Sequence, residues 1–225
     1  MCGRYGFTIR DKKKFYKRFN IQNTLDGYGQ NYNVSPGVEN PVIITHSPNQ
    51  IVLMLWGLLP VWAKDRSIGY SLINARSESV AEKTSFKKAF SERRCLIPMN
   101  FFYEPDKSVK PSIPWYFRFK SREPFGVAGV YSNWKDPKSG KDIQTYSLIT
   151  VPANDIVGKV HPRMPAILKK MDEDKWLNPD TTESEHLMKY LYQYPDDEME
   201  SFRVDPIFWK RGVDHKEIVE QAVMD

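Results

Sequence analysis

The segments WYFRFK (115–120), PFGVAGVY (124–131) and QTYSLITV (144–151) follow one another closely in the second half of the chain. Each is a short run rich in aromatic and β-branched residues, as is typical of buried strands. Charged turns such as DPKSG (136–140) separate them. This succession predicts a sheet in which most neighbouring strands are antiparallel.

More strands are predicted on both sides of this region. Residues 41–45 and 51–56 suit a hairpin that turns at Ser47-Pro48-Asn49. The remaining strand candidates are short apolar or alternating runs at residues 2–8, 95–98, 101–105 and 166–168.

Short helices interrupt the predicted strands. Asp11 is a suitable N-cap for a basic helix that follows it, and Thr182 with Glu185 forms a capping box ahead of a C-terminal helix. Many strands with short flanking helices predict an α+β domain whose mostly antiparallel sheet is curved and barrel-like.

Composition limits the class of protein. The chain has 225 residues, of which 40% are hydrophobic and 13% aromatic, so a single domain over residues 1–225 can bury a proper core. There is neither an apolar run long enough for a transmembrane helix nor the apolar core of a signal peptide, so we expect a cytoplasmic protein. A net charge of +5 permits a polyanionic partner such as nucleic acid.

The chain begins with Met1-Cys2-Gly3-Arg4. Cysteine is small enough for a preceding methionine to be removed, which would leave Cys2 with both a free amine and a thiol. Their unperturbed pKa values are about 8 and about 8.5, so part of each group is reactive near neutral pH. Together they can convert an aldehyde into a thiazolidine ring. The alternative is an idle cysteine at a frayed terminus, and these four residues alone favour that alternative.

Polar residues beside predicted strands are further candidates. Asn74 and Arg76 end an apolar lead-in that would deliver them to a site. Glu104 ends an aromatic run, where it is either exposed by strand alternation or held in a pocket with a raised pKa. His161 lies among basic residues, where it suits either chemistry or a local hydrogen bond.

Tryptophan and cysteine have simpler interpretations. We expect Trp56 and Cys95 in the core. Trp62 lies beside a proline and two basic residues, so stacking on a nucleobase is an alternative to burial. The lysines at 83–88 suit a solvated helix face. No zinc-type Cys/His spacing or glycine-rich phosphate loop is present, so we expect no metal and no cofactor.

Taken together, these stretches resemble the SOS-response-associated peptidase family, the abasic-site processing proteins of bacteria with a eukaryotic counterpart. The resemblance runs from Met1 to about Leu177. It is carried by the ordered motifs MCGR (1–4), YNVSP (32–36), WGLLPVWA (56–63), INARSE (73–78), CLIP (95–98), FYE (102–104) and HPRMP (161–165).

The resemblance implies a self-processing peptidase that removes Met1 and then uses Cys2 to trap abasic sites in single-stranded DNA as a thiazolidine crosslink. By motif, Asn74 would orient the Cys2 amine. Glu104 would transfer protons during imine formation and ring closure, and His161 would assist opening of the sugar ring. These are roles that an amide, a carboxylate and an imidazole can fill.

The same resemblance implies how DNA would be held by what we expect to be a monomer. Arginines would neutralise phosphates, Asn33 would line the site, and an apolar pair would lie where bases unstack. The residues are Arg4, Arg76 and Arg163 for the phosphates, and Pro36 and Trp62 for the bases.

This sequence departs from the family pattern at three places. Pro105 replaces a frequent tryptophan, Pro162 replaces an acidic or amide residue, and residues 209–212 replace an Asn-rich stretch. Two other classes of function stay open from the residues themselves. One is an amidohydrolase with Cys2 as N-terminal nucleophile. The other is a nucleic-acid binding module in which Cys2 is idle.

Overall fold

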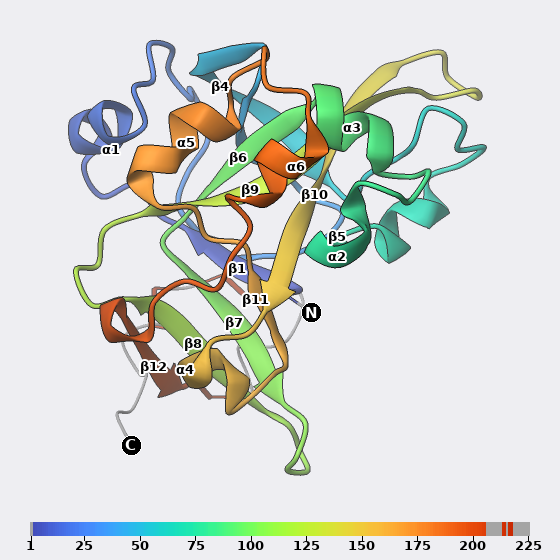
Figure 1. The fold of residues 1–225 in the computed structure, drawn as a ribbon. Coiled ribbons are helices and arrows are strands. Elements are labelled where there is room, and N and C mark those ends of the chain that lie inside the picture. The colour runs from blue at the N-terminus through green and yellow to red at the C-terminus, as the bar shows by residue number, and fades with distance from the viewer. Residues whose placement is uncertain (1, 206–212, 215, 218–225) are drawn as a thin grey trace.

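A closed barrel forms the upper part of the molecule in Figure 1. The computed structural model describes residues 2–205, 213–214 and 216–217. Neighbouring barrel strands are antiparallel except β4 and β10, whose parallel pairing closes the barrel. The strands are β3 (Glu39–Ile44), β4 (Ser47–Trp56), β6 (Arg94–Met99), β9 (Phe125–Lys135) and β10 (Asp142–Pro152).

Strand β10 extends beyond the barrel and carries two short strands there. Strand β5 (Asn74–Arg76) pairs with it in parallel, and β11 (Arg163–Pro165) pairs with it antiparallel. Residues 74–76 and 163–165 are therefore both fixed against the same long strand, although they are far apart in the chain.

A second sheet lies below the barrel (Figure 1). Its order is β12 (Met199–Arg203), β8 (Ile113–Phe119), β7 (Phe101–Asp106), β1 (Arg4–Phe7) and β2 (Asn31–Val34), and every neighbouring pair is antiparallel.

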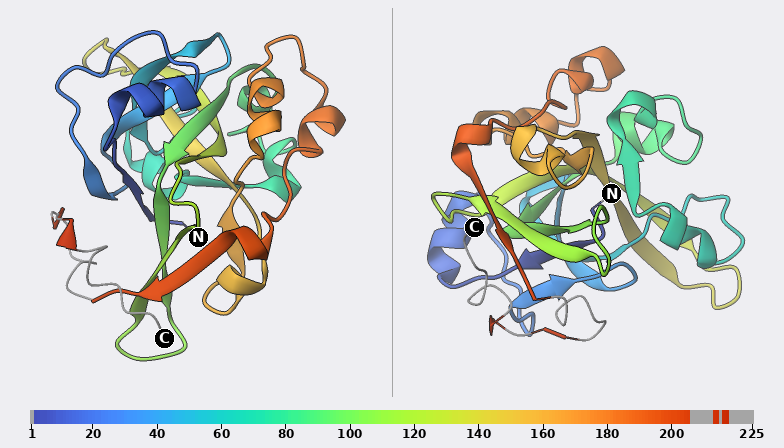
Figure 2. Two further views of the ribbon diagram at one scale, coloured as in Figure 1. Left: turned by 90° about the vertical axis from the view of Figure 1, so that its left-hand side faces the viewer. Right: turned by 90° about the horizontal axis from the view of Figure 1, so that it is seen from below.

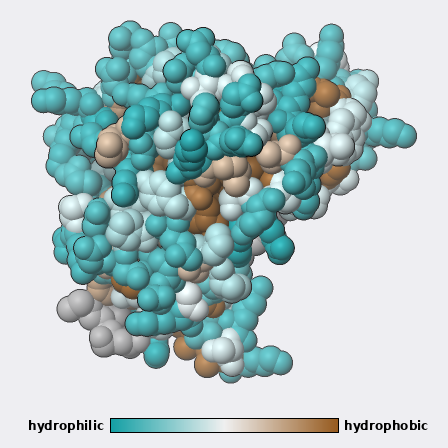
Figure 3. Space-filling model, in the orientation of Figure 1, coloured by the Kyte–Doolittle hydropathy of each residue, from teal (hydrophilic) through white to brown (hydrophobic). Residues whose placement is uncertain are grey.

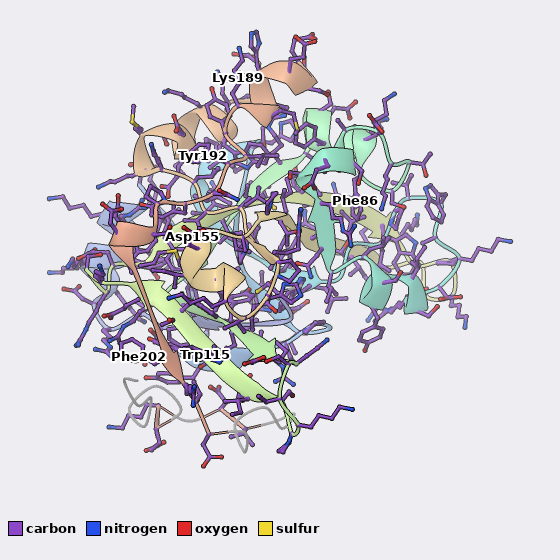
Figure 4. The ribbon with its side chains drawn as sticks, turned by 60° about the horizontal axis from the view of Figure 1, so that its bottom comes forward. Phe86, Trp115, Asp155, Lys189, Tyr192 and Phe202 are labelled. Atoms are coloured by element: carbon purple, nitrogen blue, oxygen red, sulfur yellow. The ribbon has the colours of Figure 1, made fainter. Side chains whose placement is uncertain are left out.

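The two faces of this second sheet are packed differently. Phe102 and Phe117 belong to the main core, with their rings stacked at a centroid distance of 5.1 Å. The opposite face carries a smaller aromatic cluster around Phe101 and Tyr116. Phe202 of this cluster and Trp115 lie on the adjacent strands β12 and β8 (Figure 4). The ring of Phe101 lies over Gly6, where any Cβ would be 1.9 Å from a ring carbon, so this packing requires glycine.

Short helices surround the two sheets (Figure 2). They are α1 (Lys12–Arg18), α2 (Ser77–Val80), α3 (Lys87–Glu92), α4 (Asp155–Gly158), α5 (Lys170–Trp176) and α6 (Ser184–Met188), with the 3-10 turns η1 (Ser67–Ser71) and η2 (Asp196–Glu198). The surface shown in Figure 3 is mainly hydrophilic, with small apolar areas. Within the described residues, no helix has the length and apolar character needed to span a membrane.

The architecture confirms the α+β prediction with its curved, mostly antiparallel sheet. Asp11 is the N-cap of α1, as expected, and its side chain accepts a hydrogen bond of 3.0 Å from the Lys14 backbone N–H. Trp56 and Cys95 are buried in the core. Lys87 and Lys88 of α3 are exposed, as expected for a solvated helix face, whereas Lys83 is exposed but lies in the turn before α3.

Three local predictions were wrong. The β3–β4 hairpin turns at residues 45–46 because Ser47 already pairs with Ile44, so Ser47-Pro48-Asn49 belongs to β4. The N-cap of α6 is Glu183, without a side-chain hydrogen bond, so the proposed capping box at Thr182 does not form. Residues 166–168 do not form the predicted strand. Strand β11 ends at Pro165, and beyond it Ile167 makes only an isolated bridge with Val127.

Candidate active site

Cys2 lies just before β1, close to the end marked N in Figure 1, and is in contact with Asn74 of β5. Its side chain is fully buried, and its thiol donates to the Arg4 carbonyl at 3.5 Å. The Asn74 Nδ2 group donates to the Cys2 carbonyl at 2.8 Å. A residue that the sequence leaves free to fray is therefore held in place by a side chain 72 positions away.

Asn74 is positioned by the pairing of β5 with β10, which sets it opposite Leu148. Its side chain is buried, and among the described residues its Oδ1 atom has no hydrogen-bond partner. A buried acceptor without a donor is unfavourable by about 1–3 kcal/mol. This oxygen is therefore suited to accept a hydrogen from an amine or a ligand beside Cys2.

Glu104 is carried by β7 and is completely buried. Alternation along β7 places it on the same face as Phe102, toward the main core. Burial raises the pKa of this carboxyl to about 7, because the charged form loses its hydration. Burial and then the nearby Glu104 charge also raise the pKa of the Cys2 thiol. Near neutral pH, Glu104 can therefore both donate and accept a proton.

His161 follows α4 and is half-buried. Its Nδ1 atom lies 3.1 Å from the Arg163 backbone nitrogen and 3.2 Å from the Arg163 carbonyl oxygen, so Arg163 fixes the orientation of the ring. Burial lowers the pKa of this imidazole. Burial therefore favours the neutral form of the ring.

The candidate phosphate-binding arginines are held by other side chains. Arg163 makes a bidentate ion pair with Glu78, with Nη2 and Oε2 at 2.9 Å, and also donates to Thr150. Arg4 donates to the Asn33 Oδ1 atom at 2.9 Å, and Asn33 in turn donates to the Val213 carbonyl at 2.6 Å. These contacts orient the cationic groups before any ligand arrives.

The other predicted DNA-binding residues are Arg76, Trp62 and Pro36. Arg76 is exposed, two positions after Asn74 on β5, so alternation places both side chains on one face of the strand. Trp62 is 54% exposed, which rules out the core interpretation. Pro36 is half-buried in the loop after β2. No hydrogen bond or ring contact recorded among the described residues joins Trp62 or Pro36 to Cys2.

Two neighbours of the site were missed from the sequence. Lys107, in the β7–β8 hairpin, opposes the effect of burial on the pKa of Glu104 and adds to the effect of burial on the pKa of His161. Its position three residues after Glu104 was the available signal. Glu78 is the last residue of the INARSE motif. Its pairing with Arg163 was not predicted, because it depends on tertiary structure.

Comparison with known proteins identifies the family. The family model described as SOS response associated peptidase (SRAP) matches residues 1–208. The abasic site processing protein YoqW of Bacillus subtilis (strain 168) is 37% identical over 224 residues, covering 98% of this chain and 99% of that protein. The abasic site processing protein HMCES of Xenopus tropicalis is 28% identical, covering 79% of this chain and 66% of that protein.

A solved structure has the same fold. A protein from Bacteroides thetaiotaomicron superposes with a TM-score of 0.89 at 27% identity, covering 99% of this chain and 100% of that one. The family match extends beyond Leu177, where the sequence motifs end. The buried cysteine beside Asn74 and Glu104, the barrel that holds them and these matches agree, and the chain belongs to the SOS response associated peptidase family.

Proposed function

We propose that this protein processes abasic sites by trapping them covalently in single-stranded DNA through Cys2. The observation that carries the proposal is the setting of Cys2. Its backbone is held by Asn74, and its thiol lies beside a carboxyl whose pKa is about 7. The relatives named as abasic site processing proteins support the choice of substrate.

The reaction starts with hydrolysis of the bond between Met1 and Cys2, which uses one water and releases methionine. Until then the Cys2 nitrogen is an amide and cannot attack a carbonyl. The freed amine condenses with the aldehyde of the ring-opened abasic sugar, giving an imine and one water. The thiol then adds across the imine carbon, and its proton passes to the nitrogen, which closes the thiazolidine.

Each polar residue has a role that its chemistry permits. Glu104 accepts a proton from the amine and returns it to the leaving water, because its carboxyl changes protonation state near pH 7. The Asn74 Oδ1 atom accepts a hydrogen from the Cys2 amine. His161 assists opening of the sugar ring by donating a proton from its imidazole to the sugar oxygen.

DNA is held by groups around this centre. Arg4, Arg76 and Arg163 neutralise the phosphates that flank the abasic sugar, and Asn33 lines the path of the strand. The exposed ring of Trp62, with Pro36, stacks on neighbouring bases without reading their sequence.

Intact mass measurement tests the proposal directly. The protein is incubated with a single-stranded oligonucleotide that carries one abasic site. We expect loss of Met1 and a one-to-one adduct that survives denaturation. The Cys2→Ala variant forms no such adduct, whereas Cys95→Ala, which alters the other buried cysteine, still forms it.

Other outcomes would select a different function. Turnover of an external amide without a DNA adduct identifies an amidohydrolase. DNA binding that is lost with salt and is unchanged in Cys2→Ala identifies a non-covalent binding module. A heat-stable adduct on Cys2→Ser would exclude the thiazolidine.

A further inference from the structure

A cleft lies at the other end of β1 from Cys2. It has a volume of about 670 Å³ and is bounded by the segment after β1, helix α1, the start of β7 and the connection between β8 and β9. This volume lies within the range of roughly 300–1,000 Å³ that is usual for ligand sites. In Figure 1, α1 is well separated from the N-terminus.

The lining of this cleft is unusually basic. Five cationic side chains line it, against the two carboxylates Asp11 and Glu123. The five are Arg10, Lys14, Arg18, Arg118 and Arg122.

Two of these cations are already neutralised from outside the cleft. Arg18 pairs with the buried Glu173 at 2.7 Å, and Arg118 pairs with Glu200 at 2.6 Å. Lys14 pairs with Glu123, but both side chains are well exposed, at 66% and 40%. An exposed pair of this kind is worth only about 0–1 kcal/mol, so Lys14 is available to another anion.

Arg10 and Arg122 differ from the other three cations of the cleft. Both are exposed, and within the described parts of the chain neither makes an ion pair. Arg122 also has a φ of 59°, a conformation in which glycine or asparagine would be easier to accommodate. Two guanidinium groups that form no ion pair among the described residues therefore line the same cleft, and their planar donors match the geometry of a phosphate group.

The floor of the cleft is rigid and aromatic. Phe101 and Tyr116 lie beneath it with a ring centroid distance of 4.8 Å, and both are almost fully buried. They give the cleft a fixed shape but expose too little surface to stack on a base. The half-buried Tyr32 is the one lining ring placed to contact a ligand at the rim. We therefore expect the cleft to recognise the charge of a ligand rather than a nucleobase.

The cleft lies within reach of a strand that occupies the Cys2 site. Arg4, on the site side of β1, and Thr8, on the wall of the cleft, are separated by four positions, or about 13 Å at the usual rise of a strand. The exposed lysines of α1 continue the positive surface past the cleft: Lys12, Lys13 and Lys17.

We propose that this cleft binds the phosphodiester backbone of a nucleic-acid strand at a distance from the covalent centre, with Arg10 and Arg122 as the principal contacts. The proposal takes its class of ligand from the proposed function. It does not depend on the chemistry of Cys2, because it concerns reversible binding of undamaged DNA.

The test compares the wild type with the double variant Arg10→Gln/Arg122→Gln. Binding of undamaged single-stranded oligothymidylate is measured by fluorescence anisotropy over a series of salt concentrations. Because each phosphate contact contributes about 0.7 to the slope of log K against log salt, we expect the slope to fall by about 1.4 and affinity at 0.1 M salt to fall on the order of tenfold.

A matched control removes the same charge elsewhere. Lys87→Gln/Lys88→Gln changes two exposed lysines on α3, and we expect its salt slope to match the wild type. An equal loss in both double variants would overturn the proposal, since only net charge would then matter. An unchanged slope in the arginine variant would overturn it as well.

Two further measurements distinguish this proposal from binding of a free nucleotide and from the proposed covalent function. Displacement of oligothymidylate from the cleft by equimolar 5′-thymidylate would assign the cleft to a free nucleotide rather than a strand. Crosslinking of abasic DNA at saturating concentration is expected to be equal in the wild type and in both double variants. Absence of an adduct in all three proteins would reject the proposed function while leaving the salt-slope result intact.

Discussion

Glu104 is the residue whose chemistry depends most on its position in the fold. In solution a glutamate is ionised at pH 7, but the complete burial of this one raises its pKa from 4.5 to about 7. The same burial that makes Glu104 a usable acid and base also makes its ionised form unfavourable in the folded protein. The proposed proton transfer by Glu104 and the stability of the fold therefore depend on the same burial.

The first prediction concerns this coupling. Between pH 4.5 and about 7 the folded state holds a proton that the unfolded state has released, so stability falls as pH rises through this window. The full loss is about 3 kcal/mol above pH 7, at 1.36 kcal/mol for each pKa unit. Glu104→Gln removes this loss, so it is expected to be more stable than the wild type at pH 8 but not at pH 4.5.

Urea unfolding at both pH values measures the effect. The exposed Glu82→Gln serves as the control and should show no gain at pH 8. The same Glu104→Gln protein is expected to form the crosslink at least about 100-fold more slowly, since general acid–base catalysis typically contributes 10²–10⁴-fold. Equal stability differences at the two pH values would contradict the assigned pKa.

The second prediction concerns Glu78, which holds Arg163 in a bidentate pair. A phosphate must compete with this carboxylate for the same guanidinium. Glu78→Gln is therefore expected to bind undamaged single-stranded DNA more tightly, by about fivefold if the pair is worth about 1 kcal/mol. Fluorescence anisotropy measures the change, and Glu82→Gln removes the same charge without releasing Arg163. Equal gains in both variants would refute a specific role for Glu78.

At the scale of elements, a buried arginine links the ends of α3 (Lys87–Glu92) and α5 (Lys170–Trp176) to the barrel. Arg94, the first residue of β6, is completely buried and donates to carbonyl groups at the ends of two helices. Its Nε atom donates to the Trp176 carbonyl at 2.8 Å, and Nη2 donates to the Asn178 carbonyl at 2.6 Å. Nη1 donates to the Ser91 carbonyl at the end of α3.

These contacts give the third prediction. Arg94→Met keeps most of the apolar volume but leaves several buried carbonyl groups without donors. Because hydrogen bonds to charged groups contribute about 1.5–3 kcal/mol each, we expect a loss of about 4 kcal/mol in the free energy of unfolding. Urea unfolding is the measurement, with the exposed Lys88→Met as control. A loss below that of the control would mean that α3 and α5 are held by other contacts.

For the molecule as a whole, the electrostatic balance determines how DNA binding responds to salt. The net charge is only +5, so attraction depends on where the arginines are placed. The fourth prediction is that binding of undamaged single-stranded DNA weakens as salt is added. Three or more phosphate contacts should give a plot of log K against log salt with a negative slope of magnitude about 2 or more.

The covalent adduct should behave differently. Once the thiazolidine has formed, raising the salt concentration is expected to leave the amount of adduct unchanged, since no counterion competes with a covalent bond. Denaturing gels after transfer to high salt measure this. An adduct that disappears with salt would indicate a complex held by charge alone.

Much of the fold was accessible from the sequence because it depends on local properties. Alternating and β-branched runs located the strands at 115–120, 124–131 and 144–151, and the Asp11 cap began α1 at the predicted place. The hairpin turn was misplaced because the register between β3 and β4, not the Ser-Pro-Asn stretch, decides where the chain reverses.

From the sequence we predicted the strand-rich α+β class, which the structure confirms, and a set of candidate site residues that includes Cys2. Only the tertiary structure decided that Asn74 holds the Cys2 backbone, that Glu104 is buried with a pKa of about 7, and that Glu78 pairs with Arg163. The difference arises from how far apart in the chain the interacting residues are. Strand patterns and caps depend on neighbours in the chain, whereas desolvation and ion pairing depend on residues brought together by the barrel and the sheet beside it.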